Sequence, residues 1–122
     1  MKTTRPLELV YFYIFPTQTK DEGTVYTFVA LDDYSEFLFF LGIETDISEL
    51  KIVNHIIGLT QSKDFAGRFE NKPLTLMLPF EEGTVPHDLV SDVLKIFKGT
   101  VVYDPDTVSK KMQPVLSTAF GV

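Results

Sequence analysis

The sequence predicts a mixed α/β fold, in which a five-stranded sheet carries helices on both of its faces. Three observations lead to this prediction. Segments rich in β-branched and aromatic residues fill the first third of the chain. Helical and strand-like periods then alternate, which gives the order β-β-β-α-β-α-β-α. The first strand-like segment is apolar on both faces, as is typical of a strand at the centre of a sheet.

The first three strands are predicted to form an antiparallel meander. They are expected at residues 7–15, 24–31 and 36–43. The first should end at Pro16, because proline has no N–H group to donate to a neighbouring strand. A polar loop with Gly23 separates the first two strands, and a turn at residues 32–35 separates the second from the third. Since both connections are short, each strand should run antiparallel to the next.

Helices and strands alternate in the rest of the chain. Helices are expected at residues 46–60, 86–98 and 106–120, strands at residues 73–80 and 100–103, and a connection at residues 61–72. Asp46 is a plausible N-cap, Gly99 is a suitable C′ residue, and Pro114 is expected to kink or divide the last helix. Leu50 and Leu89 belong to the apolar stripes of the first two helices. Helical crossovers make the last two strands parallel to their neighbours, and the strand order becomes 3-2-1-4-5.

Composition excludes several classes of function. The 122 residues are expected to form a single domain over residues 1–122. The lack of cysteine excludes disulfides, thiol catalysis and thiolate metal sites. A net charge of −6 opposes non-specific binding to nucleic acid, which relies on Lys and Arg contacts to phosphates. No apolar stretch is long enough to span a bilayer, and the start lacks a signal-peptide cleavage pattern, so a cytoplasmic protein is expected.

A series of short motifs runs through the first half of the chain. Arg5-Pro6 precedes the strand sequence LELVYFYIF, a loop with Gly23 follows, and the next strand reads YTFVALDDYS over residues 26–35. Together with FLFFLGIETDISELKIVNHIIGL, these motifs resemble the catalytic core of retroviral integrases and insertion-sequence transposases. The resemblance covers about residues 5–60 by motif and the rest by topology. It implies the ribonuclease H-like fold and a tendency to form dimers.

Asp32 and Asp33 stand together at the end of the second strand, where two acids would suit either catalysis or a turn. Asp side chains bond neighbouring backbone amides and tolerate unusual φ values, which favours the turn. In the family that the chain resembles, the equivalent pair closes the hairpin and is not catalytic. Both arguments predict a structural role in the hairpin.

Integrase-type catalysis needs carboxylates that hold two divalent metal ions. The resemblance implies one carboxylate in the first strand, one after the fourth strand and one on the final helix. The chain has Tyr13 in the first place and Glu81 in the second, and its final helix carries Lys110 and Lys111 but no acid in residues 107–120. A tyrosine does not bridge two Mg²⁺ ions as a carboxylate does. The resemblance therefore implies a degenerate site, with the first catalytic Asp lost at Tyr13.

Three functions stay open. The first is a catalytically inactive integrase- or transposase-core-like domain, derived from a mobile element, that acts as an assembly or protein-interaction module without a cofactor. The second is a divalent-metal-dependent nuclease or strand-transfer enzyme that holds Mg²⁺ or Mn²⁺ with Glu81, Glu82 and Asp104 at the carboxyl edge of the parallel strands. The third is an unrelated α/β ligand-binding domain with a pocket near Tyr13, Phe80 and Tyr103. The first is favoured, because no loop residue replaces an acid in the first strand.

Partner predictions rest on the surface that the third strand would expose. If this strand forms the sheet edge, aromatic residues within 37–40 should be exposed and favour association with a protein partner or a second copy of the chain. Nucleic acid stays open as a partner through the family resemblance. The basic residues around the first crossover are Lys51, Lys63, Arg68 and Lys72. Neither His55 nor His87 has a second histidine at ligand spacing, so neither is expected to bind a metal.

Overall fold

A computed structural model, which describes residues 2–121, confirms the predicted fold class. The strands are β1 (Leu9–Thr19), β2 (Gly23–Asp32), β3 (Leu38–Glu44), β4 (Leu74–Leu78) and β5 (Gly99–Tyr103). The helices are α1 (Glu49–Gln61), α2 (Lys63–Arg68), α3 (His87–Leu94) and α4 (Pro105–Phe120), with a 3-10 turn η1 (Lys95–Phe97) after α3. The five strands form one sheet in the order β3-β2-β1-β4-β5. β1, β2 and β3 pair antiparallel, whereas β4 is parallel to both β1 and β5, so the arrangement is the ribonuclease H-like fold.

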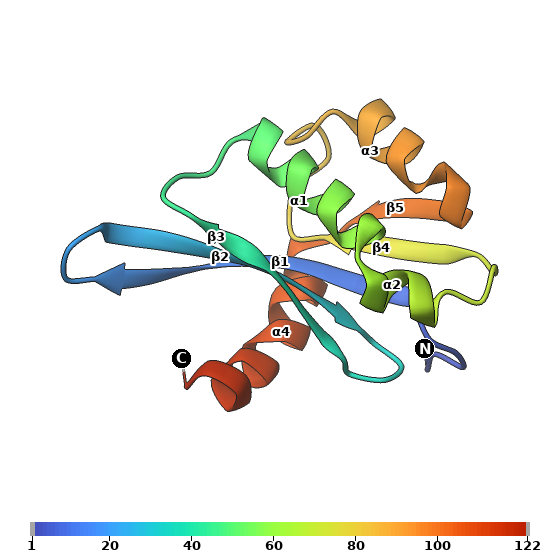
Figure 1. The fold of residues 1–122 in the computed structure, drawn as a ribbon, viewed down its shortest axis with the longest axis horizontal. Coiled ribbons are helices and arrows are strands. Elements are labelled where there is room, and N and C mark those ends of the chain that lie inside the picture. Colours follow the sequence, from blue (N-terminus) through green and yellow to red (C-terminus); the bar gives the residue numbers. More distant parts are fainter. Residues whose placement is uncertain (1, 122) are drawn as a thin grey trace.

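The sheet lies between two helical layers. Helices α1, α2 and α3 cover one face, and α4 covers the other (Figure 1). Successive side chains of β1 point to opposite faces: Val10 and Phe12 join the cluster under α1–α3, and Tyr11 and Phe15 join the cluster under α4. β1 therefore supplies both cores, which is why its sequence is apolar on both faces.

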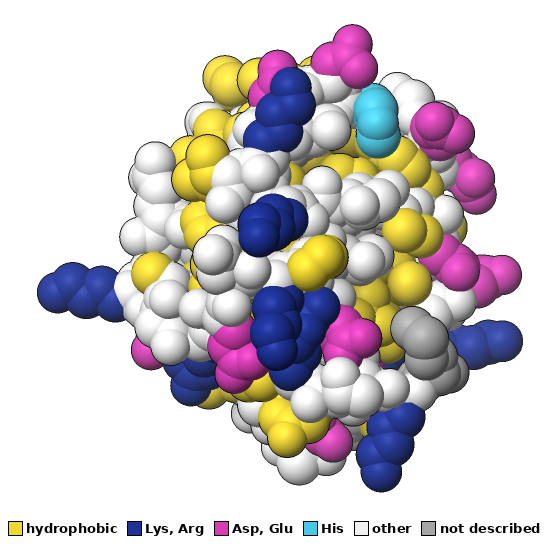
Figure 2. Space-filling view, turned by 90° about the vertical axis from the view of Figure 1, so that its right-hand side faces the viewer, with side chains coloured by type: hydrophobic (Ala, Val, Ile, Leu, Met, Phe, Trp, Pro, Cys, Tyr) yellow, Lys and Arg dark blue, Asp and Glu magenta, His cyan; other side chains and the backbone are white. Residues whose placement is uncertain are grey.

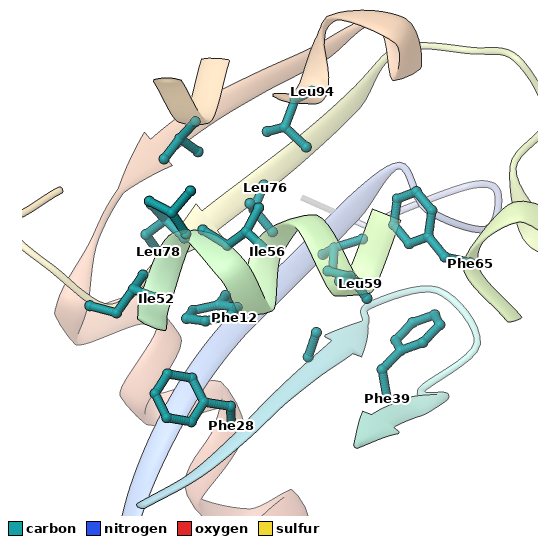
Figure 3. Packing of buried hydrophobic residues seen from close by; sticks show 14 of the residues in the cluster. Phe12, Phe28, Phe39, Ile52, Ile56, Leu59, Phe65, Leu76, Leu78 and Leu94 are labelled. Atoms are coloured by element: carbon teal, nitrogen blue, oxygen red, sulfur yellow. The ribbon is translucent and has the colours of Figure 1, made fainter. Parts of the chain in front are cut away.

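The larger core fills the space between the sheet and α1–α3. Ile52, Ile56 and Leu59 recur on α1 at helical spacing and belong to the same cluster as Phe12 and Phe28 of the sheet (Figure 3). Full burial of side chains of this size stabilises the fold by about 1.5–3 kcal/mol each. The smaller core consists of Val108, Met112 and Leu116 of α4 packed on Tyr11, Val29 and Leu31 of the sheet. Within residues 2–121, no helix combines the length and the apolar character needed to cross a membrane.

β1 continues through Pro16, where the sequence predicted its end. Pro16 is paired with Tyr26 of β2, but β4 pairs only with the stretch from Leu9 to Tyr11. Past that stretch β1 has a neighbour on one side only, so a proline can lie there with its missing N–H group toward the open side. The β1–β2 hairpin accordingly projects beyond the rest of the sheet (Figure 1).

The helix boundaries also differ from the prediction. The N-cap of α1 is Ser48, whose Oγ accepts a hydrogen bond from Lys51 N at 3.2 Å, whereas Asp46 forms an ion pair with Lys51 Nζ. Helix α2 lies in the stretch predicted as a connection, and it begins at the Ser62 cap. Helix α4 runs undivided through Pro114, since its buried stripe holds it on the sheet.

Gly99 does not serve as the helical C′ residue that the sequence predicted. Lys98 has the left-handed conformation after η1, with φ of 53°, and Gly99 begins β5. A Cβ atom at Gly99 would lie 2.6 Å from Leu94 Cβ. Glycine is therefore required here by the close approach of β5 to the end of α3.

Candidate functional site

Tyr13 occupies the place on β1 where the resemblance predicts the first catalytic carboxylate. Tyr11, two residues earlier on the same face, is paired with Met77, so Tyr13 lies level with the end of β4. Its ring is half-buried against the α4 cluster. Its hydroxyl oxygen accepts a hydrogen bond from Gln113 Nε2 at 3.4 Å. Gln113 is exposed on α4, so this contact between a phenol and an amide lies at the solvent-facing side of the helix–sheet contact.

The acids proposed as alternative metal ligands lie in the segments that follow β4 and β5. Glu81 and Glu82 are exposed in the loop before α3. Asp104 is the N-cap of α4: its carboxylate oxygens accept hydrogen bonds from Thr107 Oγ1 at 2.7 Å and from Thr107 N at 3.1 Å. These two bonds lower the pKa of the Asp104 carboxyl. In the part of the chain that the structure describes, no three acidic or histidine side chains come together as a possible metal site.

The residues of the predicted ligand pocket lie on different faces of the sheet. Tyr13 packs with the α4 cluster, whereas Phe80 and Tyr103 pack against the cluster under α1–α3. The hydroxyl of Tyr103 is 2.9 Å from His87 Nδ1 at the start of α3. Burial, followed by the negative charge of Glu82, raises the pKa of the Tyr103 phenol. The structure does not bring Tyr13 together with the other two side chains.

Asp32 is fully buried and joins three parts of the chain. Its Oδ1 accepts a hydrogen bond from Leu7 N at 2.9 Å, and its Oδ2 accepts one from Ser35 Oγ at 2.6 Å and another from Ser35 N at 3.2 Å. Leu7 has a φ of 60°, a left-handed conformation that costs free energy for a branched residue. The bond to Asp32 helps to hold it there. These contacts support the interpretation of Asp32 as a structural residue of the hairpin.

Asp33 connects the same corner to α4. Its carboxylate accepts hydrogen bonds from Thr3 Oγ1 at 2.9 Å and Tyr11 Oη at 3.2 Å, and Lys111 Nζ lies at 3.2 Å. Burial alone would raise the pKa of Asp33, but the bonds from Thr3, Lys111 and Tyr11 outweigh it, so the pKa of the carboxyl is lowered. The sequence singled out Lys111 only as a misfit in a catalytic helix. Its partner, 78 positions earlier, gives no local signal.

The predicted basic residues are partly engaged within the fold. Lys51 pairs with Glu44 at 3.4 Å and with Asp46, and Arg68 pairs with Asp64 at 3.5 Å. Figure 2 shows Lys and Arg side chains distributed over one face with Asp and Glu among them. This face therefore lacks the continuous positive surface that non-specific binding to nucleic acid uses.

Both histidines have partners inside the fold. His55 Nε2 lies 2.8 Å from Glu44 Oε2, and the ring stacks on Phe28 with 4.2 Å between centroids. The hydrogen bond from His55 is the largest cause of a lowered pKa at Glu44. These contacts fasten α1 to β3, since His55 belongs to the helix and Glu44 to the strand.

The strand order and the two helical layers define an α/β protein of the ribonuclease H-like class. No family model matches the sequence, and no curated protein matches it. Among solved structures, the chain is similar to one in the "CryoEM structure of simian T-cell lymphotropic virus intasome in complex with PP2A regulatory subunit B56 gamma". The TM-score is 0.60 with 8% sequence identity, over 98% of this chain and 43% of the other. A likeness at this identity shows a common fold, and the chain spans less than half of that neighbour.

Proposed function

We propose that the chain is a catalytically inactive relative of integrase and transposase cores that acts as an assembly or protein-interaction module. The proposed loss of catalysis rests on the hydrogen bond between Tyr13 of β1 and Gln113 of α4. Hard cations such as Mg²⁺ take oxygen ligands, chiefly carboxylates. The phenol of Tyr13 and the exposed amide of Gln113 do not supply the carboxylate oxygens that two metal ions need.

The α4 side of this site is equally unsuited to cations. Lys110 and Lys111 project from the same helix, and Lys111 is already paired with Asp33. Asp104 is engaged in capping α4, which leaves Glu81 and Glu82 in an exposed loop. These contacts favour the inactive domain over the metal-dependent nuclease.

Exposed apolar residues of β3 support the proposed role in assembly. β3 forms one edge of the sheet, and its side chains Phe40 and Ile43 are 59% and 57% exposed. Phe39 is buried, so among the aromatic residues expected at this edge Phe40 is the one that faces solvent. A groove of about 350 Å³ lies between Glu36 and Leu38 on one side and the second half of α4 on the other. Exposed apolar surface at an unprotected sheet edge favours association.

A second copy of this chain is the partner that we propose for the β3 edge. From Leu38 to Ile43 the strand has no charged residue and no proline, the residues that usually discourage two edges from pairing. The similar chain belongs to a structure described as an intasome in complex with PP2A regulatory subunit B56 gamma, which agrees with a role in assembly.

A cleavage assay tests the loss of catalysis. Single-stranded DNA, duplex DNA, RNA and an RNA–DNA hybrid are incubated with the protein in Mg²⁺ and in Mn²⁺. We expect no cleavage above the level of buffer. Metal-dependent turnover that is lost in Glu81→Gln but kept in Glu70→Gln, a matched change at an exposed acid elsewhere, would refute the proposal and favour the nuclease.

A further inference from the structure

A small apolar groove lies between the first turns of α1 and α3, which stand side by side at the upper edge of Figure 1. It is lined by Glu49, Leu50 and Val53 of α1 and by Pro86 and Leu89 at the start of α3, and it encloses about 190 Å³. Val53 is buried and belongs to the core, whereas Leu50 and Leu89 are 68% and 47% exposed. The groove thus has an apolar base and two leucines open to solvent.

Core packing does not account for these leucines. The sequence places Leu50 and Leu89 in the apolar stripes of their helices, but neither belongs to a core cluster of the structure. Ile47, just before the cap of α1, is also 44% exposed. The apolar stripes of α1 and α3 therefore include residues that do not pack into either core. Adjacent apolar side chains left open in this way mark a site of association.

One acidic side chain lines the groove, and a second is the sequence neighbour of a lining residue. Glu49 lines it and Asp88 precedes Leu89, and within residues 2–121 neither forms an ion pair. Lys51, the base closest along α1, is held by Glu44 and Asp46. Acids at helix N-termini are stabilised by the helix dipole. That local effect explains an acid at each helix start, but it does not explain why leucines accompany them.

We propose that this groove binds a short basic segment of a partner protein, which inserts one apolar side chain between Leu50 and Leu89 and places Lys or Arg against Glu49 and Asp88. The apolar base supplies affinity through burial, and the acidic border selects the charge of the partner. The chain's net charge of −6 attracts a basic segment from a distance and repels an acidic one. The surface lies on α1 and α3, away from the β3 edge, so it goes beyond the proposed function.

Three synthetic peptides test the inference by their effect on the amide NMR spectrum of the labelled protein. The first carries two leucines flanked by Lys and Arg, the second carries the same leucines flanked by Glu, and the third keeps the basic residues but has Ala in place of Leu. We expect the first peptide to shift amide signals of residues 47–53 and 86–90 and to bind less tightly as salt is added. The second and third should bind at least about tenfold more weakly.

Paired variants separate the groove from general charge effects. Glu49→Lys with Asp88→Lys should weaken the first peptide about tenfold and strengthen the second. Asp21→Lys with Glu22→Lys makes an equal change in net charge on the exposed β1–β2 loop, so it should weaken the first peptide much less than the groove variant does. Leu50→Ser removes an exposed anchor without touching the core. Equal binding of basic and acidic peptides, shifts centred elsewhere, or no shift at millimolar peptide would each overturn the inference without bearing on the cleavage assay.

Discussion

At the scale of single residues, Asp32 and Asp33 have different tasks although they are adjacent. Asp32 is buried and fastens the left-handed Leu7 to the β2–β3 turn. Asp33 is partly exposed and fastens α4 to the sheet through Lys111, with further bonds from Thr3 and Tyr11. Turn chemistry alone predicted that the pair would shape the hairpin. The partners of both carboxylates lie far away in the sequence, so their wider role could not be predicted.

Replacing the buried carboxylate should destabilise the fold strongly. Both carboxylate oxygens of Asp32 accept hydrogen bonds from N–H or O–H donors. Asp32→Asn replaces one of these oxygens with an NH₂ group, which cannot accept, so at least one of the hydrogen bonds is lost. We expect the free energy of unfolding to fall by about 2–4 kcal/mol. Urea denaturation measures the change, and Asp21→Asn on the exposed β1–β2 loop serves as the control. A loss below about 0.5 kcal/mol would contradict the contacts described for Asp32.

The phenol of Tyr11 offers a test of the Asp33 cluster by pH. Burial, followed by the charge and the hydrogen bond of Asp33, raises the pKa of Tyr11 to about 12. Asp33→Asn should lower this pKa, because the negative charge is removed while burial stays. The pKa of Tyr11 in the folded protein lies above its unfolded value of about 10. The contribution of this phenol to the free energy of unfolding is therefore complete below about pH 10 and is lost as the pH rises through the folded pKa.

NMR of ¹³C-labelled tyrosine follows the Tyr11 titration directly. Tyr34, exposed in the β2–β3 turn, provides an internal reference in the same spectra. An unchanged Tyr11 titration in Asp33→Asn would show that the carboxylate does not act on the phenol.

At the scale of elements, local patterns located every strand and three of the helices, because apolar spacing depends on few residues. The predicted and observed boundaries differ where contacts with a distant element determine the local structure. Pro16 is tolerated within β1 because β4 does not pair with that part of the strand. Ser48 rather than Asp46 caps α1, and Asp46 instead forms an ion pair with Lys51. Helix α2, with six residues, is too short to show a helical period. Leu50 and Leu89 follow helical spacing but are exposed and belong to neither core cluster.

The contact between α3 and β5 gives a matched pair of glycine substitutions. Gly99→Ala would place a Cβ atom 2.6 Å from Leu94 Cβ and 3.0 Å from Leu94 O. We expect a loss of about 1–3 kcal/mol in the free energy of unfolding. Gly58→Ala, on the exposed face of α1 with no atom nearby, should instead stabilise the protein by up to about 1 kcal/mol. Equal effects of the two variants in thermal or urea unfolding would contradict the close approach at Gly99.

At the scale of the whole molecule, the strand order brings the candidate site together. It places β1 between β2 and β4 and allows α4 to cross beneath Tyr13. The order could be predicted, because short connections and helical crossovers restrict the possible topologies. The contact between Tyr13 and Gln113, 100 positions apart, could not, since it depends on how α4 lies on the sheet. For the same reason the sequence suggested a pocket from Tyr13, Phe80 and Tyr103, which lie on opposite faces.

The proposed self-association through β3 is tested on the whole molecule. We expect light scattering after gel filtration to show a dimer whose population rises with concentration. Phe40→Asp places a charge on the exposed edge and should give a monomer. Tyr34→Asp, which changes an exposed aromatic residue in the neighbouring turn, should leave the dimer intact. A wild-type protein that stays monomeric at the highest attainable concentration would rule out this interface.

Metal binding is the most direct test of the proposed loss of catalysis. Electron paramagnetic resonance of free Mn²⁺ shows how much of the ion the protein takes up, without any assumption about substrate. With Tyr13 in place of a carboxylate, we expect only weak, millimolar uptake that Glu81→Gln and Asp104→Asn leave unchanged. Micromolar binding of a pair of ions that either substitution abolishes would contradict the account.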